Sequence, residues 1–126
     1  MRIAVLVKEI PDATVRKRLD PRSGRLERSG ERTLNPHDAH AIEAAVRLRE
    51  TPSAAVEEIV AVTMGPASAS RALHRAVSLG ADRSVHLCDD AFAGSDLIAT
   101  AHVLVGALTL TTIFCFNTRI SSWCIN

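Results

Sequence analysis

The chain has 126 residues, of which 47% are hydrophobic and 23% are charged. This length and composition fit one globular domain with a sizeable core and exclude an intrinsically disordered chain. The formal net charge of +1 favours no class of partner, and three cysteines without metal-type spacing argue against a disulfide framework and for a reducing, cytoplasmic setting.

The chain opens on a short apolar stretch, Arg2–Lys8, that is rich in β-branched residues. Such a run is typical of a strand that is buried on both faces, as in a parallel sheet. Its five consecutive apolar residues, Ile3–Val7, are too few for the hydrophobic region of a secretory signal. We therefore expect a first strand of a parallel sheet here.

Residues 9–33 are polar and contain several Pro and Gly residues. The segment Asp20–Gly24, "DPRSG", has the residues of a tight turn, so we expect a loop with a short hairpin. The stretch Arg16–Arg32 holds seven Arg or Lys residues against three Asp or Glu residues. A basic hairpin can meet nucleic acid or an acidic protein, and the absence of interleaved aromatic residues favours a solvated hairpin that faces a protein.

A helix is predicted directly after Asn35. Asn35 is a strong N-cap residue, Pro36 suits the first helical position, and the acid Asp38 suits the positive end of the helix dipole. Glu43 and Arg47 form a favourable i,i+4 pair. The predicted apolar stripe consists of Ala41, Ile42, Ala45, Val46 and Leu48.

The next segments alternate between strand and helix patterns. The patterns predict strands over residues 57–65 and Arg83–Cys88. Between them they predict a helix over Ser68–Asp82 that stops at Gly80. The apolar side of this helix consists of Ala72, Leu73, Ala76 and Val77. Residues 94–108 read as a helix with Ser95 as N-cap and Asp96 in the first turn. This alternation predicts an α/β fold with a parallel sheet.

The tail, Thr109–Asn126, differs in composition from the rest, and its segment Leu110–Phe116 could form a fourth buried strand. Leu97–Phe116 has twenty residues without a charge, which is long enough to span a bilayer. His102, Gly106, the threonines and the cap signal at Ser95 favour a core helix followed by a core strand, without stable membrane insertion.

In open parallel sheets, ligands bind beyond the carboxyl ends of the strands. Gly65 allows a backbone to approach a ligand closely, and Ser68 and Ser70 could cap the next helix or face a phosphate, although a plain strand-to-helix turn explains them as well. Neither common phosphate-binding motif is present. His37 is more typical of a solvated loop, and the residue spacings indicate no catalytic triad and no metal cluster.

Five segments together resemble the β subunit of electron transfer flavoproteins, including the FixA-type members. They follow the family order over Met1 to about Leu108 and read "VLVKEIPD", "DPRSGRLERSG", "LNPHDAHAIEAAVRLRE", "VAVTMGPASASRALHRAVSLGADRSVHL" and "FAGSDLIATAHVL".

This resemblance implies an adenine-nucleotide-binding three-layer α/β sandwich, related to universal stress proteins and incomplete at its C-terminal end. It implies a heterodimer with an α subunit that holds most of the FAD. That heterodimer carries electrons from flavin dehydrogenases, such as acyl-CoA dehydrogenase, to a quinone oxidoreductase or another acceptor. The β subunit binds AMP, or a second FAD in bifurcating members, and has no catalytic residues of its own. The positions that match the nucleotide-binding residues are Leu6, Val7, Asn35, Pro36, His37, Asp38, Thr63, Met64 and Gly65.

Two departures from the family pattern limit these expectations. Asp96 and Thr100 match a stretch that borders the second flavin of bifurcating members, but Leu97 replaces a threonine there, so bifurcation is not predicted. Residues 109–126 lack the phosphate loop of the family, which divides the chain into residues 1–108 and an atypical tail and suggests a truncated copy. A stand-alone nucleotide-binding domain of the universal-stress type and a non-functional fragment remain the alternatives.

Overall fold

The computed structural model describes every residue except 13, 15, 25, 27–29 and 114–126. Within the described residues, strands β1 (Arg2–Leu6), β4 (Glu58–Met64) and β5 (Arg83–Leu87) form a parallel sheet in the order β1-β4-β5. The predicted strands at these three places are therefore confirmed. The central strand β4 is buried on both faces from Ile59 to Thr63, as its apolar run indicates.

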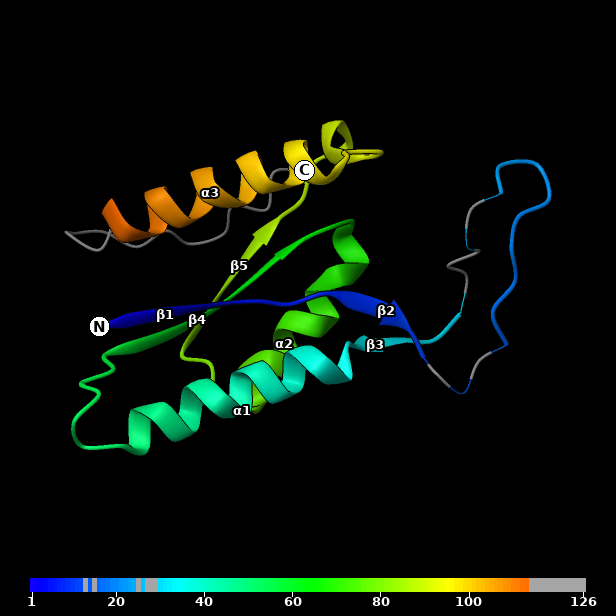
Figure 1. The fold of residues 1–126 in the computed structure, drawn as a ribbon. Coiled ribbons are helices and arrows are strands. Elements are labelled where there is room, and N and C mark those ends of the chain that lie inside the picture. The colour runs from blue at the N-terminus through cyan, green and yellow to red at the C-terminus, as the bar shows by residue number, and fades with distance from the viewer. Residues whose placement is uncertain (13, 15, 25, 27–29, 114–126) are drawn as a thin grey trace.

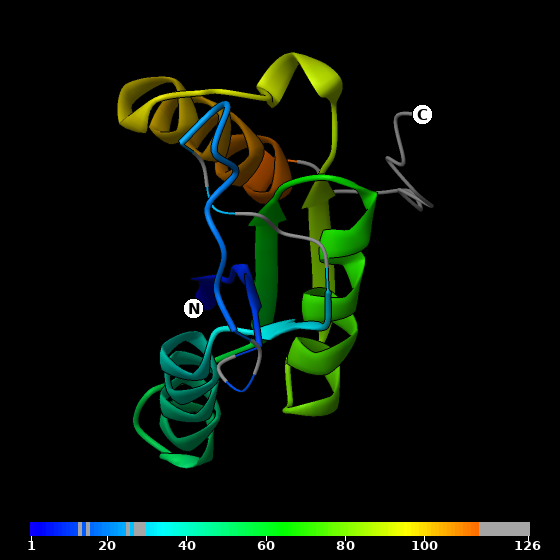
Figure 2. The ribbon, with the colours of Figure 1, turned by 90° about the vertical axis from the view of Figure 1, so that its right-hand side faces the viewer.

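Helices lie on both faces of this sheet (Figure 1). Helix α1 (Pro36–Glu50) and helix α2 (Ser70–Ser78) cover one face, because each belongs to a crossover between neighbouring parallel strands. Helix α3 (Leu97–Ile113) follows β5 and lies across the opposite face (Figures 1 and 2). The α/β architecture with a parallel sheet between layers of helices is thus confirmed.

The main core lies between the sheet and the α1–α2 layer. Ile42 of α1 and Ile59 of β4 are fully buried in it, and Leu73 and Ala76 of α2 pack from the other helix. The prediction for the α1 stripe is only partly right, since Ala41 and Leu48 are exposed. On α2, Val77 is likewise exposed instead of buried. In each case the apolar stripe is wider than the surface that the sheet offers to that helix.

The first strand also departs from its prediction. Val5 is buried against the α1–α2 layer, but Leu6 on the other face is 48% exposed and Ala4 is exposed as well. Strand β1 lies at an edge of the sheet that the described residues form, and α3 leaves part of this face uncovered. The expectation of burial on both faces is therefore wrong for β1.

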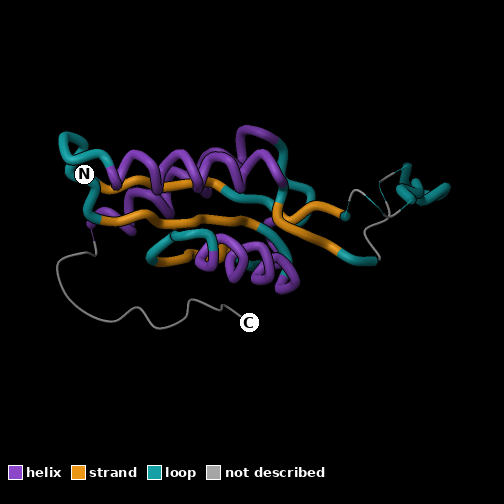
Figure 3. The backbone as a smooth tube through the Cα atoms, turned by 90° about the horizontal axis from the view of Figure 1, so that it is seen from below, coloured by secondary structure: helices purple, strands orange, loops and turns teal. Residues whose placement is uncertain are grey.

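Between β1 and α1 the chain forms an antiparallel arm, Glu9–Leu34. At its base β2 (Glu9–Pro11) pairs with β3 (Arg32–Leu34). Further along, Leu19 bridges to Leu26, and the predicted turn is closed by the backbone N–H of Gly24, which donates to the Asp20 carbonyl at 2.8 Å. Figures 1 and 3 show this arm projecting away from the sheet, so the predicted hairpin is confirmed.

The predicted C-terminal end of α2 is confirmed, whereas the predicted N-cap of α3 is wrong. Gly80, with φ of +117°, ends α2 as predicted, and a Cβ there would lie 2.7 Å from Val46 Cγ2. At α3 the cap is Asp96 and not Ser95, because Asp96 Oδ1 accepts the Ala99 N–H at 2.8 Å.

Helix α3 continues to Ile113, so the predicted strand over Leu110–Phe116 is wrong for residues 110–113, and its remainder lies outside the described residues. The apolar residues of this helix are spread around its whole circumference and not along one face. The sequence after Leu108 therefore has no periodic pattern that would distinguish a helix from a strand. Among the described residues, no helix is both long and apolar enough to cross a bilayer.

Candidate nucleotide site

The starts of α1, α2 and α3 all lie at the carboxyl edge of the sheet (Figure 1). Thr63, fully buried at the end of β4, donates its hydroxyl to the Val7 carbonyl at 2.7 Å, and the Val7 N–H donates to the Val62 carbonyl at 2.8 Å. These bonds extend the pairing of β1 and β4 past Leu6. They hold the predicted site residues Val7 and Thr63 in place at the carboxyl edge of the sheet.

The start of α1 is attached directly to this edge. The backbone of Lys8 accepts from Asn35 N–H at 3.0 Å and donates to Asp38 Oδ2 at 2.8 Å. Asn35 also caps the helix, since its Oδ1 accepts the His37 N–H at 3.2 Å and its Nδ2 donates to Asp38 Oδ1 at 3.2 Å. The predicted cap is confirmed, with Pro36 at the first helical position.

This cap uses most of the backbone donors at the helix start. Besides the His37 N–H, the N–H groups of Asp38 and Ala39 both donate to the Asn35 carbonyl, at 3.0 and 3.1 Å. A ligand at this end would therefore meet the positive end of the helix dipole and the exposed side chain of His37 rather than free backbone N–H groups.

The other face of the edge is apolar. Leu6 pairs in register with Val62, and Met64 follows two residues later on the same face, so both point to the side of the sheet that α3 covers. Leu6 is exposed and Met64 is half-buried. The edge therefore offers an apolar surface beside a polar helix start, which are the two kinds of lining that a nucleotide needs.

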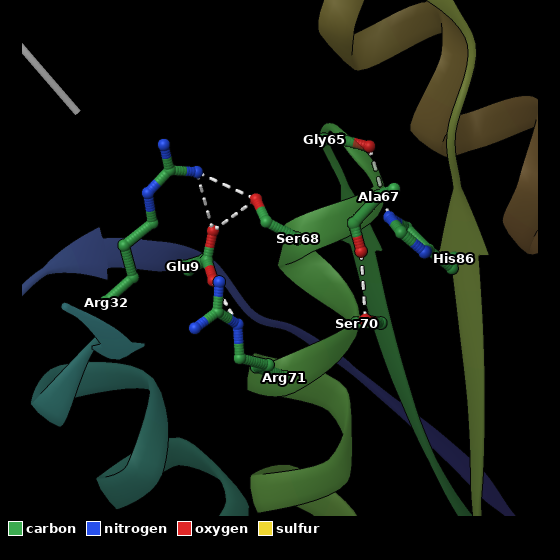
Figure 4. Close-up of polar contacts among 8 residues, drawn as sticks. All are labelled: Glu9, Arg32, Gly65, Ala67, Ser68, Ser70, Arg71 and His86. Atoms are coloured by element: carbon green, nitrogen blue, oxygen red, sulfur yellow. Dashed lines mark hydrogen bonds and ion pairs between the residues drawn. The ribbon is translucent and has the colours of Figure 1, made fainter. Parts of the chain in front are cut away.

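The turn from β4 to α2 is held from both sides. The Gly65 N–H donates to the Leu87 carbonyl at 3.0 Å, and the Gly65 carbonyl lies 3.1 Å from His86 Nε2 (Figure 4). A Cβ on Gly65 would lie 3.2 Å from Ala69 Cβ, so the glycine permits a close approach within the turn itself. His86 on β5 was not predicted as a site residue, because its partner in space is distant in sequence.

Ser68 and Ser70 do not cap α2. The residue at the cap position is Ala69, the Ser70 hydroxyl donates to the Ala67 carbonyl at 2.9 Å, and the Ser68 hydroxyl donates to Glu9 Oε2 at 3.0 Å (Figure 4). The expectation that either serine caps this helix is therefore wrong. Ser68 instead connects the turn to the base of the arm.

Asp96 is the N-cap of α3, and Thr100 lies in its first turn. Asp96 uses its carboxylate for the cap, and the Thr100 N–H donates to the Asp96 carbonyl at 3.0 Å. Among the hydrogen bonds of the described residues, none joins these two to the other predicted site residues. The structure thus bonds Thr63 to Val7, and it bonds Asn35 and Asp38 to each other and to the backbone of Lys8, the residue after Val7. The start of α3 lies at the same end of the sheet without such bonds (Figure 1).

The described residues contain no group of three or more His, Cys, Asp or Glu side chains that could hold a metal ion. A small hollow between the sheet and α3, lined by Ala4, Val60 and Leu108 among others, lies at the amino ends of the strands, away from the predicted site. The carboxyl edge remains the place where polar side chains, an apolar surface and helix starts meet.

Comparison with known proteins identifies the family of this chain. The family described as "Electron transfer flavoprotein domain" matches residues 23–120. The chain belongs to the electron transfer flavoprotein family. Protein FixA of Azorhizobium caulinodans is 41% identical over 109 residues, covering 86% of this chain and 37% of the relative.

Two further relatives match to a similar extent. The electron transfer flavoprotein subunit beta of Clostridium acetobutylicum is 38% identical, over 86% of this chain and 40% of the relative. The caffeyl-CoA reductase-Etf complex subunit CarD of Acetobacterium woodii is 40% identical, over the same shares. The chain therefore spans about two fifths of the length of the curated relatives it matches.

Proposed function

We propose that this chain belongs to the β subunit of an electron transfer flavoprotein, and that it acts as an electron carrier and not as an enzyme with its own catalytic residues. In this proposal it pairs with an α subunit that holds FAD, accepts electrons from a flavin dehydrogenase and passes them to a quinone oxidoreductase or another acceptor. The flavin supplies the redox chemistry, and the protein positions and tunes it.

The observation that carries the proposal is the junction of β1, β4 and α1 at the carboxyl edge of the sheet. Bonds from Lys8 to Asn35 and Asp38, and from Thr63 to Val7, bring the polar helix start and the strand ends into one place. We propose that AMP binds there, with its base on the apolar surface of Leu6 and Met64 and its polar part toward the start of α1.

The test is to co-express the chain with an electron transfer flavoprotein α subunit and to purify the complex. We expect a stable heterodimer with visible flavin absorbance. Denaturing this complex should release AMP, which mass spectrometry would detect. The chain alone should yield no flavin, because the α subunit holds most of it. AMP released from the chain alone, with no binding to the α subunit, would favour a stand-alone nucleotide-binding domain.

A second test asks whether the isolated chain has an enzymatic activity of its own. Turnover of a small substrate by the isolated chain without flavin would contradict the proposed role as a carrier. A heterodimer that forms but releases a second FAD in place of AMP would support the electron-transfer role and assign the site to flavin.

A further inference from the structure

The base of the arm is clamped to helix α2 through a buried carboxylate. The side chain of Glu9 is 5% exposed, and its Oε2 accepts from Arg32 Nη1 at 3.2 Å and from the Ser68 hydroxyl at 3.0 Å (Figure 4). Arg32 Nη1 also donates to Ser68 Oγ at 2.7 Å, and Arg71 Nε lies 3.8 Å from Glu9 Oε1. These contacts of Glu9 with Arg32, Ser68 and Arg71, which we call the Glu9 clamp, join both strands at the base of the arm to the start of α2. The base of the arm is therefore anchored to the domain.

The tip of the arm, Arg16–Gly24, is shaped by its own hydrogen bonds. The Asp20 carboxylate accepts from the Arg22 N–H at 2.9 Å and from the Ser23 hydroxyl at 2.7 Å, and the Gly24 N–H closes the turn. The side chain of Leu19 is 67% exposed. The tip therefore keeps its shape without packing on the rest of the domain and presents an apolar residue to solvent.

Charge is distributed very unevenly between the stretch Arg16–Arg32 of the arm and the rest of the chain. Of fifteen Lys and Arg residues seven lie in Arg16–Arg32, and of fourteen Asp and Glu residues three do, so this stretch carries a formal +4 and the remainder −3. At the tip, Arg16, Lys17, Arg18 and Arg22 are all exposed, and none of them forms an ion pair with a carboxylate of the described residues.

These features specify the chemistry of a partner. Unpaired cations around one exposed leucine are complementary to a protein surface with carboxylates around a shallow apolar spot. Nucleic acid fits less well, because Glu9–Leu34 contains no aromatic residue for stacking on bases and the remaining −3 of the chain repels a polyanion. The small size of the tip suits a transient contact whose association rate depends on salt.

We propose that the tip Arg16–Gly24 is a docking element for a partner protein with an acidic surface, and that the Glu9 clamp anchors the base of the arm that carries this tip. This inference rests on the proposed function only in the choice of proteins to test. An electron carrier must meet its donors quickly and release them, and opposite charges raise the encounter rate without requiring a tight complex.

The experiment uses the full chain and two immobilised proteins, an electron transfer flavoprotein α subunit and an acyl-CoA dehydrogenase, with a DNA duplex as a third surface. Association rate constants are measured by surface plasmon resonance from low to physiological salt. For at least one of the two proteins, we expect the rate constant to fall about tenfold over this range. The triple variant Arg16→Glu, Lys17→Glu, Arg18→Glu should lower the low-salt rate constant at least tenfold and flatten its salt dependence.

The matched control compares Arg18→Glu with Arg75→Glu, which makes the same change of charge at an exposed arginine of α2. Only the tip variant should slow association, and circular dichroism should show both variants folded. Equal rates for the two variants, or tip-dependent binding to DNA but to neither protein, would overturn the proposal. The assay needs no flavin or AMP, so its outcome is independent of whether the heterodimer carries these groups.

Discussion

At the scale of single residues, Asn35 performs two tasks that a mutation can separate. Its side chain caps α1, and its backbone N–H ties the helix start to Lys8 at the end of β1. Replacing the side chain removes the cap but leaves the backbone bond to Lys8 in place. The same side chain also lies where we propose that AMP binds, so stability and nucleotide affinity should respond differently.

We expect Asn35→Ala to lower the free energy of unfolding by about 1 kcal/mol, measured by urea denaturation, because the His37 N–H loses its partner. Asn35→Ser keeps a capping oxygen, adds no charge beside Asp38, and should lose less stability than the alanine variant. If Asn35 also contacts the nucleotide, calorimetry should show weaker AMP binding by the alanine variant under conditions where both proteins are folded. Equal AMP affinity would leave Asn35 as a cap alone.

The sequence predicts hydrogen bonds that join residues close together along the chain. The cap at Asn35 and the turn at Asp20 depend on neighbours within four positions, and both were predicted correctly. The Glu9 clamp joins Glu9 to Ser68 and Arg71, which are 59 and 62 positions away, so no local pattern indicates it. Ser95 and Asp96 are adjacent residues that both cap helices well, and only the backbone path decides between them.

At the scale of elements, the turn of the arm should respond to pH. Hydrogen bonds from the Ser23 hydroxyl and the Arg22 N–H lower the pKa of Asp20, because they stabilise its charged form. A carboxyl group whose pKa is lower in the folded state stabilises the fold above its unfolded pKa, and that contribution disappears as the pH falls through the folded value. The turn should therefore loosen below about pH 4.

The measurement for this turn is the NMR chemical shift of the Gly24 amide, which donates to the Asp20 carbonyl. It should move toward random-coil values between about pH 4 and pH 2, while amides of β4 stay unchanged over the upper part of that range. Asp20→Asn should remove this transition. A Gly24 shift that follows pH identically in the parent and in Asp20→Asn would assign the transition to another group.

Hydrophobic patterns predicted most elements because burial imposes a period on strands and helices. The α1 and α2 stripes and the run of β4 each matched an observed element. The pattern predicted the wrong burial at Leu6 on β1, because α3 covers only part of that face of the sheet. It predicted the wrong element at residues 110–113 of α3, because the apolar residues there have no periodicity. The placement of the candidate site followed from topology, since parallel strands end at one edge.

At the scale of the whole molecule, the two faces of the sheet differ in how well they are covered. The face under α1 and α2 carries the tightly packed core, including the fully buried Ile42 and Ile59. The other face carries α3, whose outer side leaves large apolar side chains in solvent. The exposed fractions are 85% for Leu97, 67% for Ile98, 60% for Val105 and 56% for Leu110.

An apolar helix surface of this kind is a site of association between proteins in water, because its burial removes apolar area from solvent. We therefore expect the isolated chain to self-associate, with a sedimentation coefficient that rises with protein concentration. The double variant Ile98→Lys, Val105→Lys should sediment as a monomer over the same range, with a melting temperature close to that of the parent, because both side chains are already exposed.

Leu48→Lys on α1 is the matched control, since it also adds a charge at an exposed apolar position but lies in the other layer. A parent chain that stays monomeric, or a Leu48→Lys variant that abolishes association as completely as the α3 variant, would show that this surface does not drive contact between copies.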